Sequence, residues 1–269
     1  MGLLHTARGY ISKRVASTDS AKIHKLSFDH PNTPQEWERE YLRRITPVTE
    51  LRHPVATVLA ALTEHGETLM EAGCGSGELS AELAIAGRSI VLLDFSEPIL
   101  KRAVQVFETS HLSPPKIVAC DLMVHPLPFP DKSVDWVWSS GVLEHWTDEE
   151  LIPLVTEMAR IARKGVISLV PSSRCVFYRW GKAIAESQAT WPYGREIPRE
   201  SLYSVFHHAG LDSIVETDCW PEHAPAFLSM TGIPTIEKKA TEWWCQLASD
   251  DPAKKGQGYL LLTIGRRSA

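Results

Sequence analysis

After Gly66 the hydrophobic residues of the chain form short runs that alternate with segments of helical period. Short apolar runs bounded by Gly, Pro, Asp or Ser are typical of buried strands. They predict strands at Thr68–Ala72, Ser89–Asp94, Lys116–Cys120, Val134–Ser139, Gly165–Val170, Leu211–Glu216 and Gly258–Ile264. The segments between them predict helices near 77–86, 97–109, 148–163 and 199–209. Strands that alternate with helices indicate βαβ units, so we expect an α/β fold with a seven-stranded, mainly parallel sheet and helices on both faces.

The N-terminal quarter of the chain, before Gly66, differs from this pattern. Residues 1–33 are polar and without period, which predicts a flexible segment. Thr33-Pro34-Gln35-Glu36 then supplies a helix N-cap, ahead of apolar residues at helical spacing. A second helix is expected from Pro54, with Gly66 ending it. Residues 34–66 are therefore expected to form two helices that cap the N-terminal end of the domain.

Two long connections, 171–198 and 217–257, exceed what neighbouring elements need, and loops of such length tend to be lids or disordered. Both connections and the first helix carry aromatic residues, which either wall an acceptor pocket or pack the lids onto the sheet. These residues are Trp37, Tyr41, Phe177, Tyr178, Trp180, Trp191, Tyr193, Trp220, Phe227, Trp243 and Trp244. Arg174, Arg179 and Arg195 are candidates to pair with an anionic group on an acceptor, or are solvated.

Composition narrows the class of protein. Lys and Arg total 28 against 33 Asp and Glu, a net charge of −5, which argues against nucleic acid as a partner. The 5 cysteines are scattered and form no C-x-x-C pair, as in proteins of a reducing compartment. Without an apolar run long enough to span a membrane, a cytoplasmic protein is expected. The start, Met1-Gly2-Leu3-Leu4-His5-Thr6, fits the loose N-myristoylation pattern, so acylation stays an alternative.

The first strand runs straight into a glycine-rich turn, Glu71-Ala72-Gly73-Cys74-Gly75-Ser76-Gly77, which opens a helix. Missing side chains let a ligand approach the backbone, and free N–H groups at a helix start attract anionic groups. The second strand ends in Asp94, about twenty residues after the first glycine, where a carboxylate accepts two ribose hydroxyls or begins the next helix. An NAD site is disfavoured because Glu78 follows Gly77, which places the third glycine one residue early.

Two further motifs follow in order. Cys120-Asp121-Leu122 ends the third strand, and residues 131–145 carry the fourth strand and end in Leu143-Glu144-His145. The four motifs together resemble the class I S-adenosylmethionine-dependent methyltransferases, in particular the type 11 methyltransferase domain, over roughly residues 66–170. The resemblance implies a Rossmann-like sheet and S-adenosylmethionine as cofactor. Together with the length of the chain, which favours a single domain with insertions, we expect one domain over 34–269, with a cofactor-binding core at 67–170 and lid insertions at 171–198 and 217–257.

The resemblance assigns roles residue by residue. Glu71 would lie near the cofactor amino group, and the three glycines would let the methionine portion pass. Asp94 would hold the ribose with Phe95 beside the adenine, while Asp121 and the Leu122 N–H would reach the adenine ring. The full implied cofactor set is Glu71, Gly73, Cys74, Gly75, Gly77, Asp94, Phe95, Ser96, Asp121, Leu122, Ser139 and Ser140.

Methyl transfer from a sulfonium is an in-line displacement, so catalysis lies largely in positioning the acceptor, and a base is needed only when the acceptor loses a proton. His145 is the candidate base, with a structural role as the alternative. Glu144-His145 also resembles an E-x-x-E-H metal motif of some O-methyltransferases, but Gly141 replaces its first glutamate, so we expect no required metal.

We therefore expect a methyltransferase that acts on oxygen, nitrogen or carbon of a small-molecule acceptor. The alternatives are a protein or RNA methyltransferase and a non-catalytic protein that binds the cofactor or a partner. The sequence leaves the acceptor and the oligomeric state open.

Overall fold

The computed structural model describes Trp37, Glu38, Tyr41, Ile45 and residues 47–191 and 193–267. The expected flexible segment 1–33 and the N-cap signal at Thr33 therefore lie outside the described residues. The strands are β1 Thr68–Ala72, β2 Ser89–Asp94, β3 Lys116–Ala119, β4 Val134–Ser140, β5 Ala162–Pro171, β6 Ser213–Cys219 and β7 Leu260–Arg266. The α-helices with assigned bounds are α3 Pro54–Leu62, α4 Glu78–Ile85, α5 Glu97–Thr109, α6 Asp148–Ile161, α7 Val176–Ser187, α8 Tyr203–His208 and α9 Pro234–Gln246. Short 3-10 helices are η1 Leu143–His145, η2 Pro221–Thr231 and η3 Pro252–Lys254.

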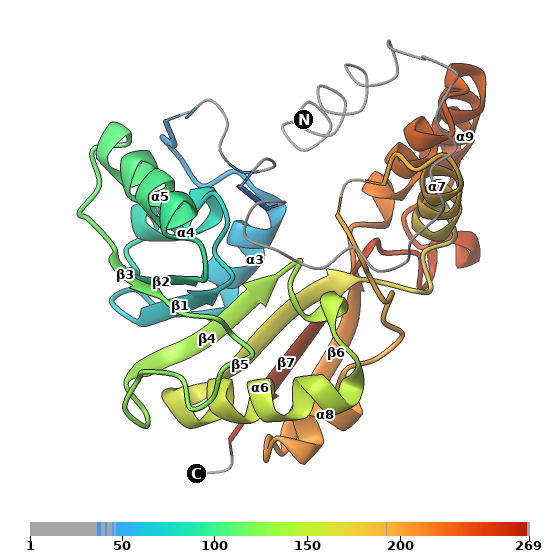
Figure 1. The fold of residues 1–269 in the computed structure, drawn as a ribbon. Helices are drawn as coiled ribbons and strands as arrows, with labels where there is room; N and C mark the ends of the chain where they lie inside the picture. The colour runs from blue at the N-terminus through green and yellow to red at the C-terminus, as the bar shows by residue number, and fades with distance from the viewer. Residues whose placement is uncertain (1–36, 39–40, 42–44, 46, 192, 268–269) are drawn as a thin grey trace. The chain divides into compact units, whose positions relative to one another are not determined.

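The strands form one seven-stranded sheet in the order β3-β2-β1-β4-β5-β7-β6 (Figure 1). β1 pairs in parallel with both β2 and β4, β2 with β3, and β4 with β5. The chain moves outward from β1 to β2 and β3, then returns to β4 on the other side of β1. Such a reversal opens a crevice at the carboxyl ends of the strands, where ligands bind in open α/β sheets.

β7 runs against its neighbours, as the hydrogen bonds at its two ends show. The N–H of Ser172, just past β5, donates to the carbonyl of Tyr259 before β7, while the N–H of Arg267 after β7 donates to the carbonyl of Lys164 near the start of β5. The N–H of Asp212, before β6, donates to the carbonyl of Arg266 at the end of β7. The expected mainly parallel sheet is confirmed, with one antiparallel strand inserted near its edge.

Helices cover both faces of the sheet, with α4 and α5 on one side and α6 and α8 on the other (Figure 1). The strands between them are nearly continuous apolar runs because both faces are covered. Leu69, Met70, Leu92, Leu93 and Val137 are each fully buried. This rigid core fixes the positions of the loops that follow β1, β2 and β4.

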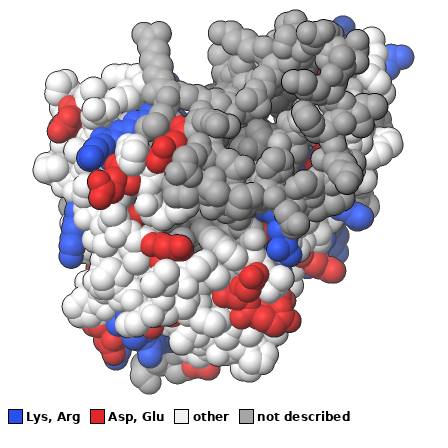
Figure 2. All heavy atoms as spheres, in the orientation of Figure 1, with Lys and Arg blue, Asp and Glu red and all other residues white. Residues whose placement is uncertain are grey.

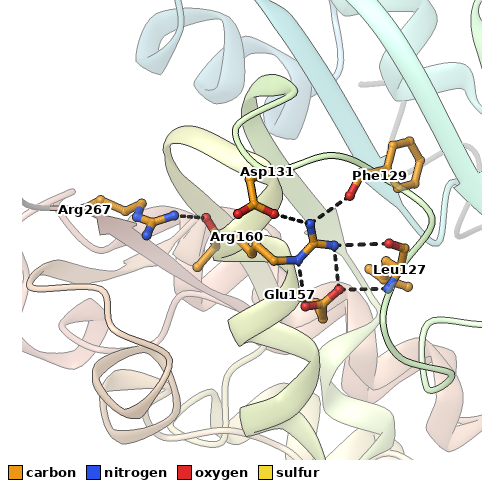
Figure 3. Close-up of polar contacts among 7 residues, drawn as sticks. Leu127, Phe129, Asp131, Glu157, Arg160 and Arg267 are labelled. Carbon is orange, nitrogen blue, oxygen red and sulfur yellow. Dashed lines mark hydrogen bonds and ion pairs between the residues drawn. The ribbon is translucent and has the colours of Figure 1, made fainter.

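The end of α6 is tied to the loop before β4 by Arg160 (Figure 3). Its guanidinium donates to the carbonyls of Leu127 and Phe129 and to the carboxylates of Glu157 and Asp131, at 2.7–3.1 Å. Glu157 also accepts from the Leu127 N–H. These contacts hold the connection that carries the chain from the end of β3 to β4.

Two compact units emerge from the packing. Of the described residues, one holds those within 37–169, 202–216 and 263–267, and the other holds 170–191, 193–201 and 217–262. In the second unit α7 packs on η2 and α9 through Cys175, Phe177, Tyr178, Ala224, Leu228 and Trp244, all buried. The two expected insertions are therefore ordered and pack with each other. Among the described residues, no helix has the length and apolar character needed to cross a membrane.

Several predicted element boundaries are wrong by two or three residues. β6 begins at Ser213 rather than Leu211, because the Leu211 N–H donates to the carbonyl of Phe206 and closes the turn after α8. β5 begins at Ala162, where the predicted helix was to continue to residue 163, because Ala162 pairs with Val134 of β4. These differences leave the carboxyl edge of β1, β2 and β4 as predicted.

Candidate active site

All three glycines of the loop after β1 have left-handed backbone, with φ of 73° at Gly73, 49° at Gly75 and 71° at Gly77. Residues with a Cβ rarely adopt this conformation. Each glycine is also crowded from a different direction. A Cβ would lie 2.7 Å from Val142 Cγ2 at Gly73, 3.0 Å from the Tyr41 ring at Gly75 and 2.7 Å from the Ala103 Cβ at Gly77. These three positions therefore require glycine, because both the backbone conformation and the neighbouring atoms exclude a side chain.

Asp94, at the end of β2, is bonded directly to the glycine loop. Its Oδ2 accepts from the Gly75 N–H at 3.2 Å, and its Oδ1 accepts from the Ser96 N–H at 3.0 Å. Ser96 in turn caps α5 by accepting from the Ile99 N–H. Burial raises the pKa of Asp94, against the lowering effect of these hydrogen bonds. This geometry is compatible with both interpretations of the sequence. Asp94 can begin the helix that follows β2, and its carboxylate can also bind a ligand at the edge of the sheet.

Glu71, the last acidic residue before the glycines, is 3% exposed and accepts a hydrogen bond of 2.6 Å from the Ser80 hydroxyl of α4. Burial raises its pKa well above the ordinary value, and the negative charge of Asp94 adds to the shift. Burial likewise raises the pKa of the Cys74 thiol between them. Two buried carboxylates with raised pKa values favour a cationic ligand, because a nearby positive charge stabilises their ionised forms.

The end of β3 lies beside the end of β2, since the Cys120 N–H donates to the Asp94 carbonyl at 2.9 Å. Asp121 is exposed and accepts from the Met123 N–H, whereas Leu122 is buried. Phe95 is half-buried. The structure thus brings the expected adenine and ribose residues to one edge of the sheet.

The loop after β4 contacts the glycine loop through Val142 at Gly73. Ser139 is fully buried and its hydroxyl bonds to that of Ser168 in β5, so its side chain points into the sheet, while Ser140 is half-buried at the strand end. His145 follows in η1 and is 6% exposed, and its ring centroid lies 5.2 Å from that of Trp37 and 6.2 Å from that of Trp146, both in edge-on packing. The candidate base therefore lies close to the glycine loop.

Gly141, where the metal motif would carry its first glutamate, has a positive φ of 70°, and a Cβ there would lie 3.6 Å from Glu144 Oε1. Within the described part of the chain no three His, Cys, Asp or Glu side chains gather as a metal site. That no metal is required stays a prediction.

Two polar neighbours of the site were not predicted. Ser80, which bonds Glu71, lies one helical turn inside α4, and Glu38, which accepts from the Ser96 hydroxyl at 2.8 Å, lies 58 residues away in sequence. The pattern of the sequence held no signal for the second contact, because it depends on how a distant helix turn packs.

Most of the lid aromatics pack with each other inside the second unit. Phe177 meets Trp244 at 4.9 Å, and Tyr178 meets Phe227 at 5.2 Å and Trp191 at 6.2 Å between ring centroids. Arg174 pairs with Asp218 of the same unit. For these aromatic residues the structure supports the second alternative, in which the rings serve packing rather than line an acceptor pocket.

Residues 70–170 match the family model described as a methyltransferase domain of type 11. Phosphoethanolamine N-methyltransferase 3 of Arabidopsis thaliana is 27% identical over 100 residues, which are 37% of this chain but only 20% of that protein. A Mycobacterium tuberculosis protein named "probable S-adenosylmethionine-dependent methyltransferase" is 24% identical over 215 residues, 80% of this chain and 70% of the relative.

The fold is shared with solved structures. Magnesium protoporphyrin IX methyltransferase of Synechocystis PCC 6803, solved with bound SAH, superposes with a TM-score of 0.53 and 18% identity over 87% of this chain and 93% of that one. Residues 70–170 therefore carry a methyltransferase domain similar to the class I S-adenosylmethionine-dependent methyltransferases, whose cofactor is S-adenosylmethionine.

Proposed function

We propose that this protein transfers the methyl group of S-adenosylmethionine to an oxygen, nitrogen or carbon atom of a small-molecule acceptor in the cytoplasm. The cofactor supplies an electrophilic methyl on a sulfonium. The protein's part is to hold the acceptor in line behind that methyl and to exclude water. His145 accepts the proton when the acceptor atom must lose one.

The contact between Val142 and Gly73 carries this proposal. It joins the loop that ends in His145 to the glycine loop, so the candidate base and the cofactor loop border the same space. His145 is 6% exposed and packs against Trp37 and Trp146. Aromatic walls of this kind keep water away from the reacting atoms and fix the imidazole ring.

Charge and the relatives favour a small acceptor. On the face shown in Figure 2, the described Lys and Arg residues are interspersed with Asp and Glu rather than gathered into a basic surface. A nucleic-acid acceptor requires phosphate contacts from a basic surface, which the described residues of this face do not form. One relative acts, by its name, on phosphoethanolamine, which is a small molecule. The free cysteines agree with a reducing compartment.

Turnover on a panel of phenols, amines and carboxylic acids, followed by the S-adenosylhomocysteine formed, tests the proposal. For acceptors that must lose a proton, His145→Gln should lower kcat by about a hundredfold or more, the range of general-base catalysis. The affinity for S-adenosylmethionine should change by less than about twofold, since uniform cofactor binding does not need the base.

His111→Gln, at an exposed histidine after α5, is the matched control and should leave turnover unchanged. Undiminished turnover in His145→Gln would remove the base role. Cofactor binding without turnover on any acceptor would instead favour the non-catalytic alternative, and affinity for NAD in place of S-adenosylmethionine would favour oxidoreduction.

A further inference from the structure

Three described helical residues, Trp37, Glu38 and Tyr41, contact three separate loops of the cofactor site. The Tyr41 ring lies on Gly75 in the loop after β1, and Glu38 accepts from the Ser96 hydroxyl after β2 at 2.8 Å. Trp37 meets His145 in the loop after β4 at 5.2 Å between ring centroids. All of these residues lie in the same compact unit. The three side chains therefore lie at the edge of the sheet where β1, β2 and β4 end.

Tyr41 has the closest contact with the glycine loop. A Cβ built on Gly75 would lie 3.0 Å from both Cε1 and Cζ of the Tyr41 ring and 3.3 Å from Cδ1. The ring is further held by Trp37, stacked at 6.0 Å with an interplanar angle of 25°. A ligand that passes along the bare backbone at Gly75 must therefore lie beside this ring.

The surroundings of the ring are arranged for positive charge. Glu71 and Asp94 contribute carboxylates that are buried, at 3% and 5% exposure. Aromatic rings attract cations through the quadrupole of the π-system, most strongly where water is excluded. S-adenosylmethionine carries a sulfonium, whereas its product S-adenosylhomocysteine has the same skeleton with a neutral thioether.

We propose that Tyr41 is a specificity-determining residue whose ring binds the sulfonium of S-adenosylmethionine and lets the enzyme favour the donor over its demethylated product. The Glu38–Ser96 hydrogen bond positions the helix turn that carries the ring. This inference rests on the proposed function, because it takes the glycine loop to bind the methyl donor of that reaction.

Isothermal titration of S-adenosylmethionine and S-adenosylhomocysteine into the full chain tests the inference through the ratio of the two dissociation constants. Tyr41→Leu should weaken S-adenosylmethionine about three- to tenfold and leave S-adenosylhomocysteine nearly unchanged, the size expected for one cation–π contact. Tyr41→Phe keeps the ring and should keep the ratio.

Glu38→Gln is the matched control, since it removes a negative charge but keeps an oxygen that accepts from Ser96. Its ratio should equal that of the wild type. A ratio that falls as far in Glu38→Gln as in Tyr41→Leu would assign the discrimination to the carboxylate and overturn the role of the ring.

Two other results separate this inference from the proposed function. Equal weakening of both ligands in Tyr41→Leu, with a wild-type melting temperature, would show that the ring only packs on the loop and would overturn this inference alone. A wild-type protein that binds neither ligand would overturn the proposed function and this inference with it.

Discussion

The carboxylates of the site are the residues whose chemistry depends most on their surroundings. Burial raises the pKa of both Glu71 and Asp94, and no Lys or Arg is a hydrogen-bond partner of either among the described contacts. Buried acids of this kind cost stability when ionised and bind cations well when ionised. Function and stability are therefore opposed at these positions, as is common in active sites.

Glu71→Gln tests that opposition. The folded-state pKa of Glu71 is raised above its unfolded value, so its contribution to stability is complete below the unfolded pKa and is lost as the pH rises through the folded pKa. Glutamine is never ionised and still accepts from Ser80. The variant should therefore gain stability over the wild type as the pH rises, in urea unfolding at pH 5 and pH 8.

The same variant should bind S-adenosylmethionine about tenfold more weakly at neutral pH, because a neutral amide replaces a carboxylate near the cofactor amino group. A difference in stability between the wild type and Glu71→Gln that is the same at pH 5 and pH 8 would contradict the raised pKa of Glu71. An unchanged affinity would show that the Glu71 carboxylate does not contribute to cofactor binding.

Gly77→Ala tests why the loop is bare. The added Cβ would lie 2.7 Å from that of Ala103 in α5, and φ is 71°. Left-handed strain and overpacking should together destabilise the fold by about 2–4 kcal/mol. Gly66→Ala has a similar φ of 85° with nothing within 4 Å, so it should show the strain alone, about 1–2 kcal/mol. Equal free energies of unfolding for the two variants would contradict the clash with α5.

At the scale of elements, the local sequence pattern predicted those strand bounds that depend only on neighbouring residues in the chain. β1 and β2 have the predicted bounds because each is an apolar run with a turn at both ends. The start of β6 was predicted two residues early because Leu211 belongs to the turn after α8. The Leu211 N–H donates to the Phe206 carbonyl and its side chain lies beside Gly265, and neither contact can be read from the local pattern. The contact of Tyr41 with Gly75 lay beyond prediction, since nothing in either segment specifies its partner.

Arg160 offers a test of how α6 supports the loop before β4 (Figure 3). The guanidinium is 25% exposed and satisfies two backbone carbonyls, so Arg160→Ala should lower the free energy of unfolding by about 2 kcal/mol. Its bond to Asp131, which is 75% exposed, contributes little of this.

Arg163→Ala is the control, because Arg163 is 43% exposed, pairs with Asp135 and donates to one backbone carbonyl, that of Lys132, where Arg160 donates to two. It should cost less than about 1 kcal/mol. If the two arginine variants unfold at the same urea concentration, the carbonyl contacts of Arg160 do not stabilise the loop.

For the whole molecule, the sequence predicted the fold and the edge of the sheet that holds the site. Its motifs mark the ends of β1, β2, β3 and β4, and the parallel pairing of these strands brings Gly75, Asp94 and His145 to one edge. The two long connections, 171–198 and 217–257, were identified only by their length. Their internal order comes from contacts such as Phe177 with Trp244, which join segments far apart in the chain.

Binding of S-adenosylmethionine by isothermal titration, compared between the wild type, Gly75→Val and Gly66→Val, tests the central claim most directly. The valine at Gly75 would occupy the bare surface of the loop against Tyr41, whereas Gly66 has a comparable φ and lies before β1. We predict one cofactor per wild-type chain, no detectable binding to Gly75→Val and wild-type affinity in folded Gly66→Val. Equal affinity in all three, or a wild-type chain that ignores millimolar cofactor, would contradict the account.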